Sequence, residues 1–198
     1  MNFRKGGMST KRLSKEERRR QLLGTALKIV REEGVEALTL AVLAERAGVT
    51  KPIAYEHFGT RAGLLMALFK DHDDRTTEAV NAALSRAPGS IEEVAQIVSA
   101  AYVDCVCAIG PEFGALLHAL AVSEETTDFP RTWRGFLITE FRSAFAPFVK
   151  LPKKSGDALL LGVLGAAEAL SDAAAHGRVS RNDAVAALSK LLLGAVKA

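Results

Sequence analysis

The chain has 198 residues, 48% of them hydrophobic and 25% charged, so it can bury a proper core and is not disordered over its whole length. Its two cysteines cannot form a disulfide framework, and its polar, basic N-terminus lacks the apolar segment of a secretory signal. We therefore expect a cytoplasmic globular protein.

The net charge of +3 is unevenly distributed along the chain. Residues 1–61 contain 13 Lys and Arg against 7 Asp and Glu, whereas residues 62–198 contain 13 against 16. A basic first third on a neutral to acidic remainder fits a head that binds a polyanion. A well-solvated N-terminal segment would have the same composition, so charge alone leaves both interpretations open.

Residues 1–13 have no hydrophobic periodicity and carry four positive charges, so we expect them to be mobile. They are either a basic arm that reaches a groove of DNA or a solvated tail. The first helix is predicted to follow at once, because Ser14 and Glu17 have the spacing of a capping box and apolar residues then recur at helical spacing as far as Gly34.

Residues 39–58 have the pattern of two short helices joined by a tight turn, which is typical of a helix-turn-helix. Thr39 can cap the first helix, because its hydroxyl can accept a hydrogen bond from a backbone N–H one turn on. Gly48 stands where the chain must reverse and where a positive φ is often needed. Thr50 offers a second cap, and Pro52 fits the first turn of the second helix, where the N–H that proline lacks would have no partner.

This second helix, predicted over residues 51–58, is expected to bury Ala54 and Phe58 and to present its other side chains to a ligand. A lysine there can reach guanine N7 and O6, an isoleucine can contact a thymine methyl group, and tyrosine, histidine and arginine can hold backbone phosphates. The helix N-terminus itself favours phosphate. The predicted DNA-binding residues are Thr39, Thr50, Lys51, Pro52, Ile53, Tyr55, His57 and Arg61.

Several motifs follow one another in this region: Ala-x-x-Ala-Gly-Val-Thr, ending at Thr50, then Tyr55-x-His57-Phe58, then Thr60-Arg61 followed by Leu64-Leu65. In this order and spacing they resemble the DNA-binding region of the tetracycline-repressor (TetR) family, over about residues 14–66. The resemblance implies an all-α protein of about nine helices, with an N-terminal three-helix head on a larger helical body for ligand binding and dimerisation.

Three positions depart from the pattern of that family. The family more often has Thr or Ser at Ile53, a larger aliphatic residue at Ala54, and an aromatic or basic residue at Glu56. A carboxylate that faces DNA either accepts from a cytosine amino group or repels phosphates. The role of Glu56 in reading bases is therefore left open.

Beyond the head, Thr60 can cap a long helix that reaches about Arg86, where an Ala-Pro-Gly sequence stops it, and that spans roughly 40 Å. Within it, Asp71-His72-Asp73-Asp74 has a composition suited to metal, but adjacent residues on a helix point in different directions, so we favour a solvated patch. Ser90 and Glu93 form another capping box. Further helices are predicted over about residues 91–109, 111–123, 130–148, 155–176 and 180–197.

Most aromatic residues lie in the second half of the chain and either fill a core or, as the family resemblance implies, line an effector pocket. The predicted lining residues are Tyr102, Phe113, Leu117, His118, Trp133 and Phe136, with Glu168 and Asp172 as candidate polar anchors. Both carboxylates lie on an otherwise apolar helix, where a ligand cation, an arginine of a partner subunit, or exposure at the helix edge could each explain them.

The helix predicted over residues 155–176 is apolar on nearly all sides and must be covered on more than one of them. Two copies of the chain could cover it by packing this helix and the next into a four-helix bundle, so we predict a homodimer. Glu168, Ser171 and Asp172 interrupt its apolar run, and no membrane span is expected.

Catalytic equipment is not visible in the sequence, which has no Gly-rich phosphate loop, nucleophile elbow or His-Glu-x-x-His, and no metal or cofactor is predicted. The thiols of Cys105 and Cys107 point about 200° apart on a helix, which favours core cysteines over a redox pair.

The domains predicted are an arm (1–13), a DNA-binding domain (14–59) and an effector-binding and dimerisation domain (60–198). The family resemblance implies a repressor that binds a near-palindromic double-stranded operator as a homodimer and is released by a small, partly apolar effector. The alternative is a helical small-molecule-binding or scaffold protein that no longer reads DNA, which Glu56 and the modest basic charge favour.

Overall fold

The computed structural model describes residues 13–86 and 88–197, so the predicted arm lies almost wholly outside the described part. Within those ranges the chain forms nine α-helices, one 3-10 turn and no strand, which confirms the all-α prediction. The helices are α1 (Lys15–Glu33), α2 (Leu40–Arg46), α3 (Lys51–Phe58), α4 (Arg61–Leu84), α5 (Ile91–Ile109), α6 (Phe113–Val122), α7 (Phe129–Phe145), α8 (Lys153–Ala175) and α9 (Arg181–Lys197).

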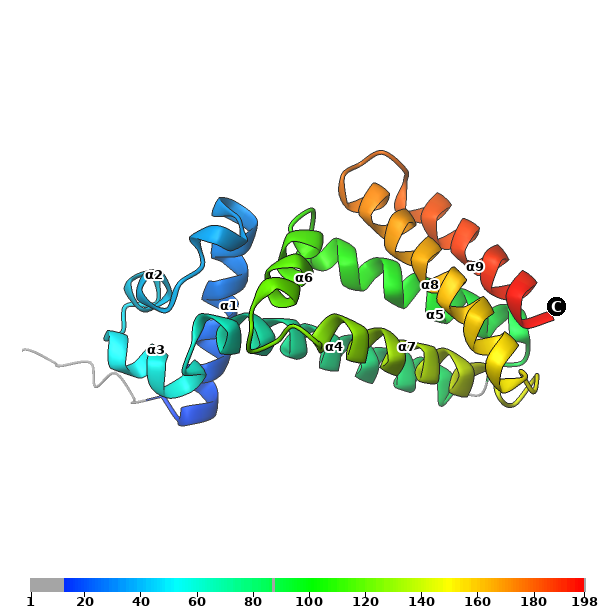
Figure 1. Cartoon of the computed structure of the whole chain (residues 1–198), viewed down its shortest axis with the longest axis horizontal. Helices are drawn as coiled ribbons and strands as arrows, with labels where there is room; N and C mark the ends of the chain where they lie inside the picture. The colour runs from blue at the N-terminus through cyan, green and yellow to red at the C-terminus, as the bar shows by residue number, and fades with distance from the viewer. Residues whose placement is uncertain (1–12, 87, 198) are drawn as a thin grey trace, which may run out of the picture.

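Helices α1 to α3 form a head at one end of the molecule (Figure 1). The capping box of Ser14 and Glu17 is complete, and the Thr39 hydroxyl accepts from the backbone N–H of Val42 at 3.2 Å. Gly48 has a φ of +65°, as the reversal between α2 and α3 requires. The prediction for Thr50 was only half right, since it occupies the N-cap position of α3 but its side chain makes no capping hydrogen bond.

The apolar interior of the head is part of one buried cluster that continues into the body. Ala54 and Phe58 of α3 are 0% and 8% exposed and pack with buried leucines of α1 and α2. The guanidinium of Arg19 lies 5.1 Å from the centre of the Phe58 ring, a cation–π contact that ties α1 to α3. The burial of Ala54 and Phe58 fixes which side of α3 faces outward.

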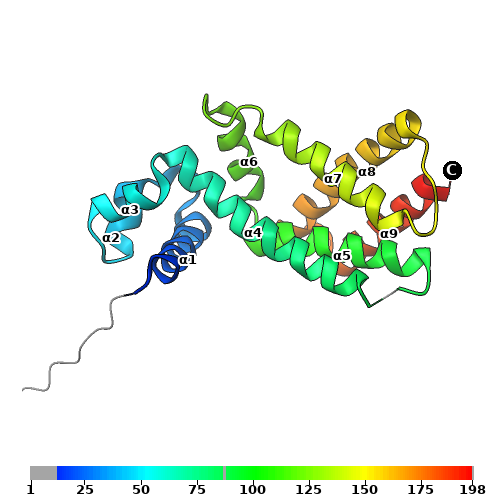
Figure 2. The same cartoon turned by 90° about the horizontal axis from the view of Figure 1, so that it is seen from below.

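The joint between head and body is the turn between α3 and α4, and α4 is shared by both. The Thr60 hydroxyl accepts from the backbone N–H of Gly63 at 3.0 Å, as a cap should. A side chain at Gly63 would not fit, because its Cβ would overlap the carbonyl oxygen of Phe58. Figure 2 shows α4 leaving the head and continuing along the body, where it packs against α5 and α6.

Helix α5 is at the centre of the body and packs against α4, α7, α8 and α9. Its N-terminus shows only half of the predicted capping box. The Ser90 hydroxyl accepts from Glu93 N at 3.2 Å, but the Glu93 carboxylate accepts from the Gly89 N–H, at 2.6 Å, instead of that of Ser90. The bounds predicted for the other body helices agree with the structure to within about one turn.

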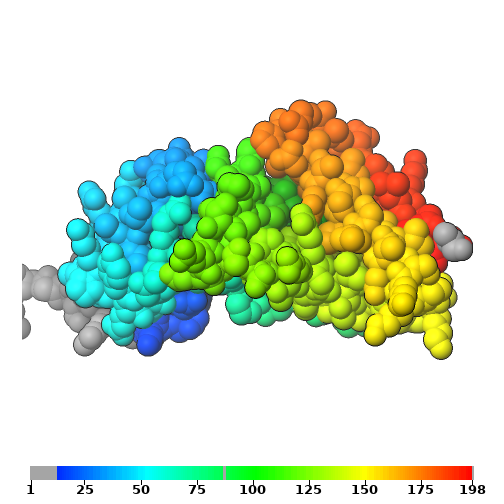
Figure 3. Space-filling model, in the orientation of Figure 1, coloured from blue at the N-terminus to red at the C-terminus, as the bar shows by residue number. Residues whose placement is uncertain are grey.

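Helices α8 and α9 lie at the edge of the body away from the head and form one continuous surface there (Figure 3). Leu161 and Leu191 are 52% and 47% exposed on them, and Leu159 is also exposed. By length and apolarity α8 could cross a membrane, as could α5 with α6 if the bend between them were ignored. A helix of a soluble protein that a second subunit covers has the same properties, and the absence of a membrane span stays a prediction.

Candidate nucleic-acid interface and body cavity

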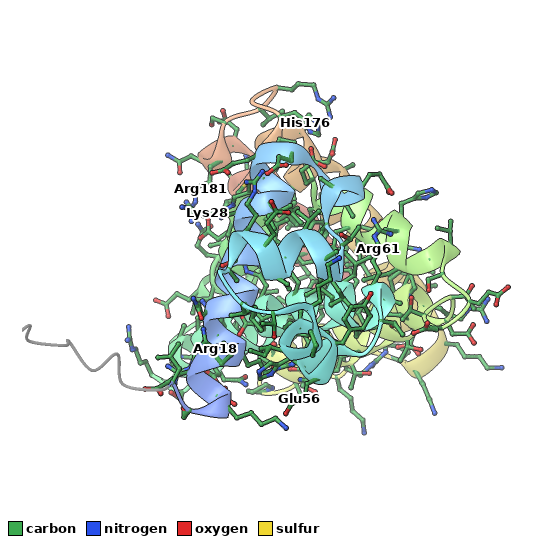
Figure 4. All side chains as sticks on the ribbon, turned by 90° about the vertical axis from the view of Figure 1, so that its left-hand side faces the viewer. Arg18, Lys28, Glu56, Arg61, His176 and Arg181 are labelled. Carbon is green, nitrogen blue, oxygen red and sulfur yellow. The ribbon has the colours of Figure 1, made fainter. Side chains whose placement is uncertain are left out.

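The outward side of α3 carries a mixed polar and apolar set of side chains at the far end of the head. Lys51, Pro52 and Tyr55 are exposed, the last by 53%, and Ile53 and His57 are partly exposed. Figure 4 looks onto this end, with Glu56 at its lower edge and Arg18 on α1 beside it. The side chains predicted to contact DNA from α3 therefore share one accessible surface, as the interpretation requires.

Contacts from α1 set the electrostatics of that surface. Lys15 Nζ lies 4.0 Å from Glu56 Oε1, and because both side chains are well exposed this pair contributes little. Arg19 donates to the backbone carbonyl of His57 at 3.1 Å. Partial burial lowers the pKa of His57 below 6.5, aided by the positive charges of α1, so its imidazole is neutral at pH 7.

Arg61 has partners within the head that the sequence did not reveal. Its Nε donates to Leu38 O at 2.9 Å and its Nη2 donates to Val35 O at 2.8 Å, with Glu36 3.3 Å away. These bonds hold the 3-10 turn Val35–Ala37 against the start of α4. They explain an arginine at this position without DNA, and the predicted phosphate contact stays a prediction.

The body contains a cavity of about 220 Å³ between α4, α5 and α7, which we call the main cavity because five aromatic rings line it. Of the residues predicted to line an effector pocket, it brings together Tyr102, Phe113, Trp133 and Phe136. Tyr102 is 7% exposed, and its hydroxyl is buried without a hydrogen-bond partner among the described residues. Burial also raises the pKa of this hydroxyl, so it stays protonated.

The sequence of the head matches a known family. Residues 22–68 fit the family described as bacterial regulatory proteins, tetR family. The head is therefore a DNA-binding region of the TetR-family type. It is 37% identical over 79 residues to the transcriptional activator FasR of Mycolicibacterium smegmatis, which covers 40% of this chain and 36% of FasR. Over 82 residues it is 37% identical to the regulator BetI of Escherichia coli, covering 41% of this chain and 42% of BetI.

Solved structures of TetR-family proteins share the fold over most of the chain. A TetR-like regulator from Rhodococcus has a TM-score of 0.69 at 21% identity, covering 92% of this chain and 97% of its own. A TetR-family regulator from Streptomyces coelicolor has a TM-score of 0.71 at 22% identity, covering 92% and 80%. At such low identity the likeness concerns the fold alone, and the match to FasR and BetI covers less than half of either protein.

The other residues predicted to line an effector pocket lie elsewhere. Leu117, Glu168 and Asp172 border a second hollow of about 270 Å³, with Phe113 between the two, and His118 is exposed and borders neither. The structure therefore does not bring all eight residues together around one cavity, and their role in binding an effector stays a prediction. The physical reason is that α4, α5 and α7 close the main cavity without any contribution from α8.

Both carboxylates predicted as ligand anchors have partners in their own chain. Arg134 of α7 donates from Nε and Nη2 to Glu168, at 2.8 and 3.0 Å, which makes a two-pronged pair. Asp172 pairs with Arg178 and lies 3.3 Å from His176 Nδ1. Neither a ligand nor a partner subunit is needed to explain them.

Asp73 is a site residue that the sequence interpretation placed on a solvated patch. Its Oδ1 accepts from Trp133 Nε1 at 3.3 Å, and it lines the main cavity. The signal was present, because Asp73 lies one turn after the buried Phe69 and one turn before Thr76 and Thr77, on the inner side of α4. The helical periodicity of residues 71–74, unlike their composition, predicts that the carboxylate of Asp73 points toward the interior of the body.

The two cysteines differ in environment. Cys105 is buried and borders the main cavity, and burial raises the pKa of its thiol to about 11. Cys107 is partly buried. A thiol with such a high pKa has almost no thiolate at pH 7, which fits the predicted core role of Cys105.

Proposed function

We propose that this chain is a ligand-responsive transcriptional regulator of the TetR family, acting as a repressor that binds a near-palindromic operator as a cytoplasmic homodimer and leaves it when a small molecule binds. The observation that carries the proposal is the position of α4. Its first half contacts α1 and α3 of the head and buries Leu64, Leu65 and Leu68, and its second half lines the main cavity through Asp73 and Thr77. One rigid helix therefore belongs to both sites.

The outward surface of α3 supports a role in reading DNA. Lys51 is suited to guanine, Ile53 to a thymine methyl group, and Tyr55 and neutral His57 to phosphate oxygens. In the described part of the chain, the side chains of Lys51, Tyr55 and His57 make no intramolecular hydrogen bond, since Arg19 donates to the backbone carbonyl of His57 and not to its ring. A ligand can therefore bind these side chains without breaking a hydrogen bond of the folded chain.

The excess of positive charge comes mainly from the arm. Residues 1–61 have 13 Lys and Arg against 7 Asp and Glu, but residues 13–61 have only 9 against 7. Phosphate attraction is proportional to the number of neutralised phosphates. We therefore propose that residues 1–12 supply most of the non-specific attraction, while α3 supplies sequence preference.

The exposed leucines on α8 and α9 support the dimer. Small residues such as Gly162 and Gly165 lie on the same helix, and a Cβ at either would meet nothing within 4 Å in the single chain. A second copy could therefore approach α8 closely and cover Leu161 and Leu191. Such a dimer would place two α3 helices in major grooves about 34 Å apart.

An effector can release DNA only if it binds one arrangement of the two heads better than the other. A ligand in the main cavity contacts the side of α4 that carries Asp73 and Thr77. A shift of α4 to fit the ligand would move the α3–α4 joint with it. Repression and release would then correspond to two positions of α4.

The direct test of this function is selection of duplexes from random DNA by the purified full chain, followed by binding to the selected site. Tyr55→Phe should weaken binding to all duplexes alike, whereas Lys51→Ala should also relax preference at one base pair, by about 1–3 kcal/mol. An unchanged preference in Lys51→Ala would refute the role assigned to Lys51.

The dimer is tested by size-exclusion chromatography with light scattering at micromolar concentration. Leu161→Glu should give a monomer, because it places a charge in the proposed interface. Val122→Glu is the matched control, since Val122 is 67% exposed on α6 and should leave the dimer intact. A monomeric unmodified chain would dispose of the dimer.

The second candidate function is a helical ligand-binding or scaffold protein that no longer reads DNA. The observation that favours it is Glu56, whose carboxylate lies on the outward surface and, among the described residues, has one ion-pair partner, the Lys15 ammonium at 4.0 Å. The two functions differ in salt dependence, because phosphate contacts release counterions and affinity then falls steeply with salt. Binding of ligand without any binding of DNA would favour the scaffold.

A further inference from the structure

The wall of the main cavity has an unusual balance of charge. Its residues include five aromatic rings, two carboxylates and several neutral polar groups, but no lysine, arginine or histidine. The rings are those of Tyr102, Phe113, Trp133, Phe136 and Phe141, and the carboxylates are those of Asp73 and Glu140. A cavity of this composition attracts positive charge and offers nothing to neutralise an anion.

Neither carboxylate has a basic partner. Within the described residues, no Lys, Arg or His nitrogen lies within 4 Å of the Asp73 or Glu140 oxygens. The basic residues near Asp73 on α4 are engaged elsewhere, since Lys70 pairs with Asp74 at 2.7 Å and Arg75 with Asp71 at 2.8 Å. His72 Nε2 lies 2.7 Å from the carbonyl oxygen of Cys105. Burial raises the pKa of Asp73, so its charge is poorly stabilised in the empty cavity.

Aromatic rings surround the Asp73 end of the cavity. Trp133 donates its indole N–H to Asp73, and its ring lies 5.1 Å from that of Phe69, 6.1 Å from Phe113 and 6.5 Å from Tyr102. Aromatic faces attract organic cations, most strongly where water is excluded. Glu140 is two turns beyond Trp133 on α7, about 10 Å along the helix axis, and borders the same cavity.

We propose that the cavity binds a lipophilic organic cation, with its ammonium group beside the carboxylate of Asp73 and its apolar part among the aromatic rings. The inference rests on the proposed effector role of this cavity and names the chemical class of the effector. The cation would stabilise the partly buried carboxylate of Asp73, and Glu140 would add a weaker attraction from the far end.

The size of the cavity sets the size of the ligand. An engineered cavity of about 150 Å³ with apolar walls holds one benzene molecule. The cavity of about 220 Å³ therefore has room for one ring and a compact ammonium group. Benzyltrimethylammonium has this form, and neopentylbenzene is the same molecule with carbon in place of the charged nitrogen.

Trp133 gives a direct readout, because it is the only tryptophan of the chain and lies in the cavity wall. We would follow its fluorescence while titrating the full chain, without DNA, with benzyltrimethylammonium, neopentylbenzene and the anion 3-phenylpropionate. The cation should bind about tenfold or more tighter than its neutral isostere. The anion should bind most weakly.

Charge-neutralising variants locate the interaction. Asp73→Asn keeps an oxygen that can accept from Trp133 Nε1, and it should weaken binding of the cation about tenfold while leaving neopentylbenzene unchanged. Glu140→Gln should have a smaller effect in the same direction. Glu78→Gln is the matched control, because Glu78 is exposed on α4 outside the cavity wall and should change nothing.

Equal or tighter binding of the neutral isostere or of the anion would overturn the inference, and so would an absence of binding by all three probes. A cation preference that Asp73→Asn leaves intact would also overturn it. DNA binding is measured separately without probe. Loss of DNA preference there would refute the proposed function and leave the fluorescence result unaffected.

Discussion

The head and the body of this molecule are built on different principles. In the head, helices begin or end at residues whose side chain or backbone conformation favours a helix end, such as the capping residues Ser14 and Thr39. Among its described residues, no buried polar side chain lacks a hydrogen-bond partner. The body contains three such groups, Ser99, Tyr102 and Ser171, together with the main cavity and the exposed leucines of α8 and α9. Unpaired buried polar groups lower the free energy of unfolding, and exposed apolar side chains favour association with other molecules, so folding alone does not explain these features.

This contrast matches the pattern of similarity to other proteins. The 37% identity to FasR and BetI spans about 80 residues, and the family match covers residues 22–68. Over 92% of the chain, a solved structure of a TetR-like regulator shares the fold at 21% identity. This pattern is consistent with the proposed function, in which the head has one general task and the body fits its own ligand.

The largest effect is expected at the joint between the two regions. Gly63→Ala would force its Cβ against the carbonyl oxygen of Phe58, where backbone must move to relieve the overlap. We expect it to lower the free energy of unfolding by about 1–3 kcal/mol and to misplace α3 against α4. Urea unfolding and binding of the selected duplex measure the two consequences.

Gly24→Ala is the control for that change. Gly24 lies in the interior of α1, and a Cβ there would meet nothing within 4 Å. Alanine favours a helix over glycine by up to about 1 kcal/mol, so this variant should be as stable as the original or more so. If Gly63→Ala behaved like Gly24→Ala, the joint would not be rigid and the coupling through α4 would lose its basis.

A smaller loss is expected from Arg61→Ala. It would leave the carbonyl groups of Val35 and Leu38 without their charged donor and so lower the free energy of unfolding by about 1–2 kcal/mol. Arg20→Ala, an exposed arginine of α1, should stay within about 0.5 kcal/mol. Weaker DNA binding by Arg61→Ala with no loss of stability would restore its predicted phosphate contact as its main role.

The smallest effect is expected in the body, from Asp73→Asn without ligand. Because burial raises the folded-state pKa of Asp73, the charged carboxylate destabilises the fold above that pKa, and the penalty disappears as the pH falls through it toward 3.8. Asp73→Asn should therefore raise Tm slightly at pH 7–8, with a difference that shrinks in acid. Thermal unfolding across that pH range measures it.

The control for this last prediction is Glu78→Gln, which removes a carboxylate from the exposed side of the same helix and should leave Tm unchanged. A lower Tm for Asp73→Asn at neutral pH would mean that the charge of Asp73 stabilises the empty cavity. The contrast between head and body would then lose this feature, because the charge of Asp73 would cause no loss of stability that a bound cation could reverse.

The sequence predicted the head well because the signals there are local. Ser14, Thr39 and Gly48 act through backbone atoms within a few residues, and the structure has them in those roles. The hydroxyl of Thr50 is the exception, since a side chain able to cap need not do so.

The cavity was less predictable because long-range packing decides it. Glu168 meets Arg134 from a helix 34 residues away, and Asp73 meets Trp133 across 60 residues. Only the arrangement of α4, α5, α7 and α8 in space determines which of these side chains face the cavity. His118 falls on an exposed side of α6 for the same reason.

The central claim is that α3, presented twice by a dimer, reads duplex DNA. Its most direct test is the affinity of the full chain for a selected duplex and for a random duplex across a range of salt concentrations. We predict that log affinity falls linearly with log salt, by about 0.9 for each neutralised phosphate, and that the selected duplex stays preferred throughout. Equal binding of both duplexes, or no binding of either in dilute buffer, would contradict the claim.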